Sequence, residues 1–320
     1  MQILPKKFKE KLSKMKIGHK ITLYYFSLIL ISILLSTFIY QHTSTYYTNQ
    51  QLKEIATQGI ESDSRNFGLF IEDINNYSKI LLANQNIQQM LESDTIHQLP
   101  TYKSLDRFLQ EFINFNTKVS SIYVFSNSGK KYYTEKASFK EIEFADIEKM
   151  SFYQDILKKR GGFILRLNQD GLIDARSNTN ISFMRVINSL YKQEKIGFLI
   201  INLNQKVLES SLGLDQENTA SILIKDGNGD TIINHNPIEG LDESAFLQKL
   251  DKQNEFWSIT EINGVNRMVT GVTNRKYGWK VLKVIPFQDL SKQLHVFNIG
   301  IVAIVLVNVV LLLFGSLFIS

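Results

Sequence analysis

Residues 120–134 read SSIYVFSNSGKKYYT, two short runs of strand-forming residues on either side of an Asn-Ser-Gly cluster at 127–129. β-branched and aromatic residues favour strands, and such a cluster favours a tight turn, so the stretch predicts a β-hairpin. Residues 221–234 read SILIKDGNGDTIIN and have the same design, with the turn at 226–229. The chain therefore predicts two units that each begin with a hairpin.

Each predicted hairpin is followed by one helix and by three more strands. The first unit predicts a helix near 142–159 that ends at Gly161 and Gly162, strands at 163–167, 181–190 and 196–203, and a short helix at 205–212. The second unit predicts a helix near 243–250 and strands near 256–262, 266–273 and 279–285. The repeated order predicts an α+β fold with tandem antiparallel α/β modules, over about 119–212 and about 219–286.

Apolar residues at helical spacing precede the first hairpin. From Leu52 to Leu91 they recur mostly three or four positions apart, which predicts one long helix over about 46–92. Pro100 predicts the end of this helix, and a shorter helix with one apolar face follows it. A helix of about 45 residues is roughly 70 Å long, more than one module needs for its own core, so we expect pairing with a second copy.

Two long apolar runs flank this region. Residues 21–40 carry no ionisable group except tyrosine, and residues 296–319 carry no charge. About twenty helical residues span roughly 30 Å, the thickness of a bilayer core, so each run predicts a transmembrane helix. A cleaved signal peptide is disfavoured for the first run, because the run ends in bulky residues and lacks a small-residue cleavage site.

The charges give the predicted orientation. Residues 1–20 contain seven lysines and one glutamate, so the chain's net charge of +5 lies in this tail. A basic flank beside an apolar run is typical of the cytoplasmic side, and this position disfavours nucleic acid as a partner. We therefore expect a cell-membrane protein with two spans in contact with lipid, residues 1–20 in the cytoplasm and residues 41–295 outside the cell.

The residue types disfavour several kinds of site. The chain has no cysteine, which excludes disulfides, zinc-thiolate sites and cysteine nucleophiles. The five histidines are scattered without metal-ligand spacing, and the calcium-like start at Asp226 has Thr231 and Pro237 where glycine and glutamate are required. Phosphate-binding glycine loops and nucleophile elbows are absent from the sequence. We predict no metal, no cofactor and no catalytic residue in these 320 residues.

Arg185 is a candidate binding residue because it lies in an otherwise apolar predicted strand. Strand alternation places it on the face of Ile181, Phe183 and Ile187, where a guanidinium needs an anionic or hydroxyl-rich partner. The alternatives are a ligand contact, an edge position in water, or a salt bridge to a helix carboxylate. The carboxylates considered for that salt bridge are Glu141 and Asp155.

Four other residues of the first module are weaker candidates for a binding site. Arg166 lies between two leucines and needs a partner for the same reason as Arg185. Tyr123, Phe125 and Tyr153 are candidates for the floor of a pocket, although aromatic residues in and around strands also serve as plain core.

Four stretches together resemble a known family. They are SSIYVFSNSGKKYYT from Ser120, SFYQDILKKRGG from Ser151, ISFMRVINSLYKQEKIGFLIINLNQKVLE from Ile181 and GWKVLKVIPFQDL from Gly278. Their order, their spacing and their position between two apolar runs are similar to those of the double Cache (PAS-like) sensor region of YesM-type bacterial sensor histidine kinases. The resemblance covers nearly the whole chain.

The resemblance implies a receptor. It implies that a small extracellular ligand binds the membrane-distal module, which is the module at about 119–212, with Phe152 and Tyr153 near the ligand. It also implies that the protein is a homodimer and that the spans carry the signal inward. It also implies a HAMP linker and a histidine kinase beyond Ser320, and a response regulator as the partner of that kinase. In the amino-acid-binding branch the aromatic pair is Trp-Tyr preceded two residues earlier by arginine, whereas Met150 stands at that place here.

Two other classes of function stay open. The same input region would also suit a membrane-bound AraC-like transcription regulator or a cyclic-dinucleotide enzyme. An adhesion or assembly protein would keep the fold without a ligand.

The predicted orientation can be tested by labelling, because the chain has no native cysteine. The variant Asn228→Cys should react with an impermeant thiol reagent on intact cells, whereas Lys9→Cys should react only after permeabilisation. The opposite labelling pattern would overturn the topology.

Overall fold

The computed structural model describes residues 17–93, 99–136, 142–167, 181–214 and 220–287, together with residues 306 and 310. The chain divides into two compact units, one from Ala56 to Pro286 and one that comprises the residues on either side of it. Within the described residues, no helix combines the length and the apolar character that a membrane crossing requires. The span predicted at 296–319 lies outside the described residues except at positions 306 and 310.

The unit from Ala56 to Pro286 contains two five-stranded antiparallel sheets with equivalent strand orders. The first sheet has the order β2-β1-β5-β4-β3 and comprises β1 (Val119–Ser126), β2 (Lys131–Glu135), β3 (Phe163–Leu167), β4 (Ile181–Asn188) and β5 (Lys195–Leu203). The second has the order β7-β6-β10-β9-β8 and comprises β6 (Ser221–Lys225), β7 (Thr231–His235), β8 (Glu255–Ile262), β9 (Val265–Thr273) and β10 (Lys280–Pro286). We call them the first and second modules. The predicted α+β fold with tandem antiparallel modules is confirmed.

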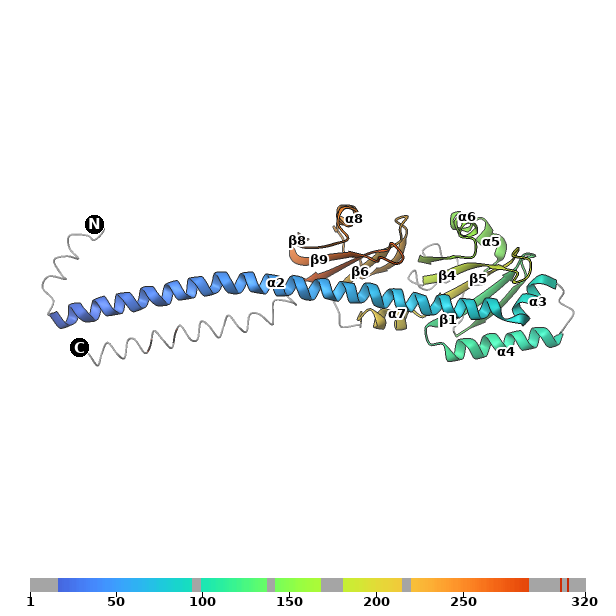
Figure 1. The fold of residues 1–320 in the computed structure, drawn as a ribbon, viewed down its shortest axis with the longest axis horizontal. Coiled ribbons are helices and arrows are strands. Elements are labelled where there is room, and N and C mark those ends of the chain that lie inside the picture. Colours follow the sequence, from blue (N-terminus) through green and yellow to red (C-terminus); the bar gives the residue numbers. More distant parts are fainter. Residues whose placement is uncertain are drawn as a thin grey trace. The chain divides into compact units, whose positions relative to one another are not determined.

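Helices cover both faces of each sheet (Figure 1). On one side of the first sheet lie α2 (Ile17–Ala83), α3 (Gln85–Ser93) and α4 (Leu99–Phe115), and on the other side lie α5 (Phe144–Glu148) and α6 (Ser151–Lys158). In the second module α8 (Glu243–Lys252) covers the face opposite α2. The short helix α7 (Gln205–Ser211) connects the modules.

One apolar stripe of α2 packs against both sheets. Five of its residues, spaced three, four or seven positions apart, are each no more than 1% exposed: Ile60, Phe67, Ile71, Ile74 and Leu81. They share one continuous core with Ile122 of the first sheet and Ile222 of the second. Fully burying such a side chain contributes about 1.5–3 kcal/mol, so this stripe is a main source of the unit's stability.

The helix predicted over about 46–92 is interrupted in the structure. α2 ends at Ala83 and α3 begins at Gln85, and the Asn84 side chain accepts hydrogen bonds from the backbone N–H groups of Asn86 (2.9 Å) and Ile87 (3.2 Å). Asn84 thus caps α3, a role for which its short side chain is well suited. Pro100 lies in the first turn of α4, where a missing N–H is tolerated, and does not end the long helix.

The helix predicted near 142–159 is also divided in two. Met150 between α5 and α6 has an extended backbone with φ −73° and ψ 141°, which ends one helix and begins the next. This break lets Phe144 and Ile147 of α5 and Phe152 of α6 all pack on the same face of the first sheet.

Both predicted hairpin turns are present. Gly129 and Gly229 close the β1–β2 and β6–β7 turns with φ of 85° and 90°, a region that glycine occupies without strain. In the second turn the Asp226 carboxylate accepts the backbone N–H groups of Asn228 and Asp230, each at 2.9 Å. This stretch is therefore a hairpin.

Candidate functional site

The candidate site is the face of the first sheet that lies beneath α5 and α6. Alternation along β1 places Tyr123 and Phe125 on this face, and β5 contributes Phe198. The Phe144 ring of α5 packs at 5.5 Å from the Phe125 ring, and the Tyr153 ring of α6 lies 5.8 Å from that of Phe198, between centroids. These rings, which we call the aromatic cluster, belong to a core that is separate from the core on α2.

A row of polar residues crosses all five strands at the edge of this cluster. Strand register pairs Glu135 with Ser121, Ser121 with Asn202, Asn202 with Ser182, and Ser182 with Arg166. Because directly paired residues of antiparallel strands point to the same face, the five side chains form one transverse line. We call this line the polar row.

The three central members of the polar row are fully buried. Ser121, Asn202 and Ser182 are each 0% exposed. The Ser182 hydroxyl donates to Asn202 Oδ1 at 2.7 Å, and Asn202 Nδ2 donates to Ser121 Oγ at 2.7 Å. An Asn side chain offers two N–H donors and an oxygen with two lone pairs, so these bonds to described residues leave part of the capacity of Asn202 unused.

Tyr123 joins the aromatic cluster to one end of the polar row. Its side chain is 1% exposed, and its hydroxyl donates to Glu135 Oε1 at 2.7 Å. Burial, followed by the hydrogen bond to the Glu135 carboxylate, raises the pKa of Tyr123 well above its usual range. The phenol is therefore a neutral donor at physiological pH.

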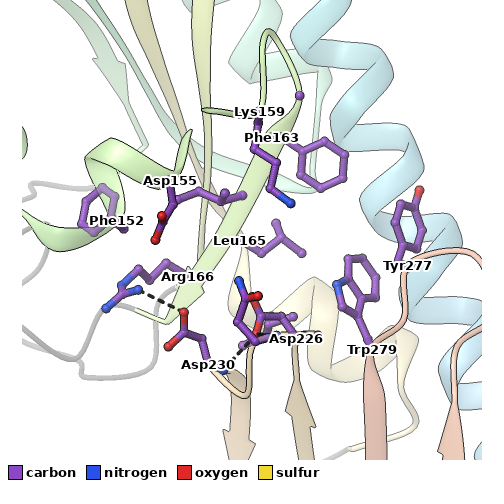
Figure 2. A pocket seen from close by; sticks show the side chains of 15 residues that line it. Phe152, Asp155, Lys159, Phe163, Leu165, Arg166, Asp226, Asp230, Tyr277 and Trp279 are labelled. Atoms are coloured by element: carbon purple, nitrogen blue, oxygen red, sulfur yellow. Dashed lines mark hydrogen bonds and ion pairs between the residues drawn. The ribbon is translucent and has the colours of Figure 1, made fainter. Parts of the chain in front are cut away.

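Arg166 is the other end of the polar row, on the edge strand β3. Its guanidinium lies 5.2 Å from the centroid of the Phe152 ring, and Nη1 is 3.5 Å from Asp230 Oδ2 in the β6–β7 turn of the second module. Figure 2 shows the Arg166 and Asp230 side chains pointing toward one another across the boundary between the modules. The Arg166 side chain of β3 thus contacts both α6 and the second module.

Lys195 brings a further charge to the aromatic cluster. Its ammonium group donates to the Tyr153 hydroxyl and lies 5.4 Å from the Phe144 ring centroid. The Tyr153 hydroxyl also donates to Glu148 Oε1 at 3.4 Å. The aromatic side chains here therefore carry polar partners at their rims, as is usual for buried tyrosines.

The structure brings together five of the six residues singled out from the sequence. Tyr123, Phe125, Phe152, Tyr153 and Arg166 all belong to this face of the first sheet or to the helix that covers it. Whether these residues bind a ligand stays a prediction.

Arg185, the sixth, lies on the opposite face of the first sheet, against α2. Its Nη1 donates to Asn75 Oδ1 at 3.2 Å and to Ser78 Oγ at 3.0 Å, and burial lowers the pKa of the guanidinium. Arg185 therefore lies on the face that strand alternation predicts. One of its partners is the Ser78 hydroxyl, which is the kind of partner expected for a guanidinium on that face. The considered partner Asp155 instead pairs with Lys158 at 3.3 Å, and Glu141 lies outside the described residues.

The corresponding face of the second module has an apolar centre. Leu223, Leu282 and Gly271 are register partners there, and a Cβ on Gly271 would lie 2.3 Å from Cε1 of Phe256. The Phe256 ring therefore occupies the space above the sheet, stacked on Phe246 at 5.7 Å between centroids. The buried polar row is a property of the first module.

Sequence reasoning missed the polar row, because it depends on register between distant strands. Ser121 and Asn202 are 81 positions apart in the chain, and Ser182 is 20 positions from Asn202. One signal was available: Asn202 interrupts the apolar run of β5, where a lone amide needs a polar partner. In the described part of the chain, no group of three or more His, Asp or Glu side chains is placed to hold a metal ion.

Comparisons with solved structures establish the fold. The chain is similar to the extracellular domain of soHK1S-Z6, a protein described as a histidine kinase, with a TM-score of 0.59, 14% identity, and coverage of 78% of this chain and 99% of that one. The ligand-binding domain of the Campylobacter jejuni chemoreceptor Tlp3, solved with L-norvaline, gives a TM-score of 0.53, 14% identity, and coverage of 77% and 95%.

A third similar structure is a domain of a protein described as a sensory box/GGDEF family member from Vibrio parahaemolyticus. Its TM-score is 0.53 at 11% identity, with coverage of 76% of this chain and 99% of that one. The similar structures are thus sensory and ligand-binding domains of signalling proteins. No protein family and no curated protein matches the sequence. Identities at this level show the fold alone.

Replacing Arg185 tests its role in attaching the first sheet to α2. Because its partners Asn75 and Ser78 are neutral, Arg185→Ala should lower the free energy of unfolding of the ligand-free chain by about 1–3 kcal/mol, measured by urea titration. The exposed Arg275 provides a control, and Arg275→Ala should change that value by less than about 0.5 kcal/mol. A loss of about 3–5 kcal/mol would contradict neutral partners, since it indicates a stranded buried charge.

The raised pKa of Tyr123 predicts a pH dependence. An acid whose pKa is higher in the folded state stabilises the fold below its unfolded pKa of about 10, and this stabilisation is lost as pH rises toward the folded value. The free energy of unfolding should therefore fall more steeply above pH 10 in wild type than in Tyr123→Phe, by up to about 1.4 kcal/mol per pH unit. Tyr191→Phe, at a side chain that is 80% exposed, is the control, and parallel curves for wild type and Tyr123→Phe would refute the assignment.

Proposed function

We propose that these 320 residues are the ligand-sensing and transmembrane region of a membrane receptor, with the two modules outside the cell. The leading output is a two-component sensor histidine kinase of the YesM type, connected through residues beyond Ser320. The observation that carries the proposal is the attachment of both modules to one continuous helix, α2.

Polar contacts fix the second module to α2. Lys283 Nζ lies 2.7 Å from Asp63 Oδ2, and both side chains are no more than 14% exposed. Asn274 Nδ2 donates to the backbone oxygen and the hydroxyl of Ser64, each at 3.2 Å. A shielded ion pair and two hydrogen bonds hold the helix in one register against this sheet.

Polar contacts fix the first module to the next turns of the same helix. Lys118 pairs with Asp73, and Arg185 donates to Asn75 and Ser78. Helix geometry places Asp63 and Ser78 about 22 Å apart along the axis. A change in the relative positions of the modules therefore acts on α2 at two separated points, and α2 is the element proposed to carry the signal.

The polar row and aromatic cluster of the first module are the proposed ligand-binding face. Buried side chains with unused hydrogen-bonding capacity beside aromatic rings suit a small organic molecule with polar groups. The similar Tlp3 domain was solved with L-norvaline, which supports a ligand of about this size. We propose no particular amino acid, because Met150 stands where the amino-acid-binding branch has arginine.

The membrane location is proposed from the sequence. Residues 21–40 and 296–319 are the proposed spans, and the lysine-rich tail is the proposed cytoplasmic flank. A homodimer is proposed because receptors of this design change the relative stability of two arrangements of paired helices. A ligand must favour one arrangement by roughly 1–3 kcal/mol to give useful coupling.

Ligand-dependent stabilisation tests the sensing function. The purified full chain in detergent is heated with the amino acids, C2–C6 carboxylates and common sugars, and at least one compound should raise the unfolding temperature. A ligand at about 100 times its Kd stabilises by about 2.7 kcal/mol. Ser182→Ala should reduce the shift, because it removes a hydroxyl of the polar row.

A matched control is available in the second module. Ser258 is a half-buried serine whose buried hydroxyl has no hydrogen-bond partner among the described residues, so Ser258→Ala should leave the ligand-dependent shift unchanged. The absence of any shift across the panel would count against sensing and favour a ligand-free adhesion or assembly role.

A further inference from the structure

A cleft lies between the two modules. Its volume is about 330 Å³, which is within the range of small-molecule sites. Figure 2 shows Lys159 and Arg166 from the first module and Tyr277 and Trp279 from the second around the same space. The cleft shares Arg166 with the polar row, and the other four members of the row do not line it.

One wall of the cleft is a fixed aromatic surface. The Tyr277 and Trp279 rings are stacked with centroids 4.2 Å apart and an interplanar angle of 12°. Phe67 of α2 supports Trp279 from behind at 4.9 Å, and Phe163 lies 6.2 Å from Tyr277. These contacts hold the wall in place without a ligand, so an apolar body that stacks on it would not have to order the wall.

The acidic side chains of the cleft already have partners. Asp226 accepts two backbone N–H groups of its own turn, and Asp155 pairs with Lys158 at 3.3 Å. Asp230 pairs with Arg166 at 3.5 Å. The carboxylates therefore offer little free capacity to a cationic ligand.

The basic side chains are more available. Lys159 is exposed and makes no ion pair with any residue in the described ranges. The Arg166–Asp230 pair is long, and its side chains are 29% and 57% exposed. A pair this open to water changes an equilibrium by about fivefold at most, so a ligand carboxylate that forms shorter, bidentate bonds with the guanidinium can replace Asp230.

We propose that the cleft between the modules binds a small carboxylate with an aromatic or branched apolar body. The apolar body packs on Tyr277 and Trp279, the carboxylate takes the place of Asp230 at Arg166, and Lys159 adds a second positive charge. Binding thereby breaks an ion pair that joins the two sheets. The signalling consequence rests on the proposed function, whereas the binding itself does not.

The fluorescence of Trp279 gives a direct readout. The chain has two tryptophans, so Trp257→Phe leaves Trp279 as the single reporter in the full-length protein. Titration with phenylacetate should give a saturable change in emission, and the uncharged phenylacetamide should give none. Titration calorimetry with the same two compounds provides a measurement that does not depend on the fluorophore.

Three charge variants distinguish exchange at Arg166 from general attraction. Arg166→Gln should weaken phenylacetate binding about tenfold or more, because it removes the bidentate partner. Asp230→Asn should instead tighten binding by about two- to fivefold, because it removes the competitor for Arg166. Lys159→Gln should weaken binding several-fold.

Lys149→Gln is the matched control for Lys159→Gln, since Lys149 also carries one positive charge but pairs with Asp146 at 3.3 Å, away from the residues that line the cleft. It should leave the affinity unchanged.

Several results would overturn the carboxylate site. They are the absence of both heat and fluorescence change up to about 10 mM phenylacetate, equal binding of phenylacetamide, or weaker binding in Asp230→Asn. If Ser182-dependent stabilisation by another compound is found while these titrations are silent, the carboxylate site fails and the sensing function stands.

Discussion

The shared core on α2 is the constraint on which the rest of the structure depends. Two sheets bury one face each against a single helix, and the Phe67 side chain at the centre of that helix segment is fully buried. Neither module can shift along the helix without exposing part of this core. Because apolar contact is not directional, the polar pairs at Asp63 and at Asn75 and Ser78 fix the register that hydrophobic burial leaves open.

The same constraint leaves each sheet one face for other uses. In the second module α8 and the Phe256 ring above Gly271 fill that face, so the face serves as core. In the first module it carries the polar row and the aromatic cluster. Arg185 belongs to the shared core side, where its partners are on α2, so its charge serves attachment of the sheet to the helix.

Much of this organisation could be predicted from local patterns, and the exceptions have physical reasons. Hairpin turns, strand alternation and helix periodicity act within about ten residues, so the strands and the tandem modules followed from the sequence. The breaks at Asn84 and Met150 did not, because an asparagine cap or an extended methionine competes closely with a continuous helix. The partners of Arg185 lie more than 100 positions away, and no local pattern identifies them.

Stability alone does not explain the polar row. Its three central side chains are bonded to one another at full burial, and such a network contributes little more than apolar residues of the same shape would. The second module has an apolar alternative at the two central positions, since Val284 and Val269 pair where the first module has Asn202 and Ser182. The first sheet thus keeps Asn202 and Ser182 where the second has valines, beneath helices that could equally cover an apolar surface. Under the proposed function these groups are kept to bind a polar ligand, which is a reason that packing does not supply.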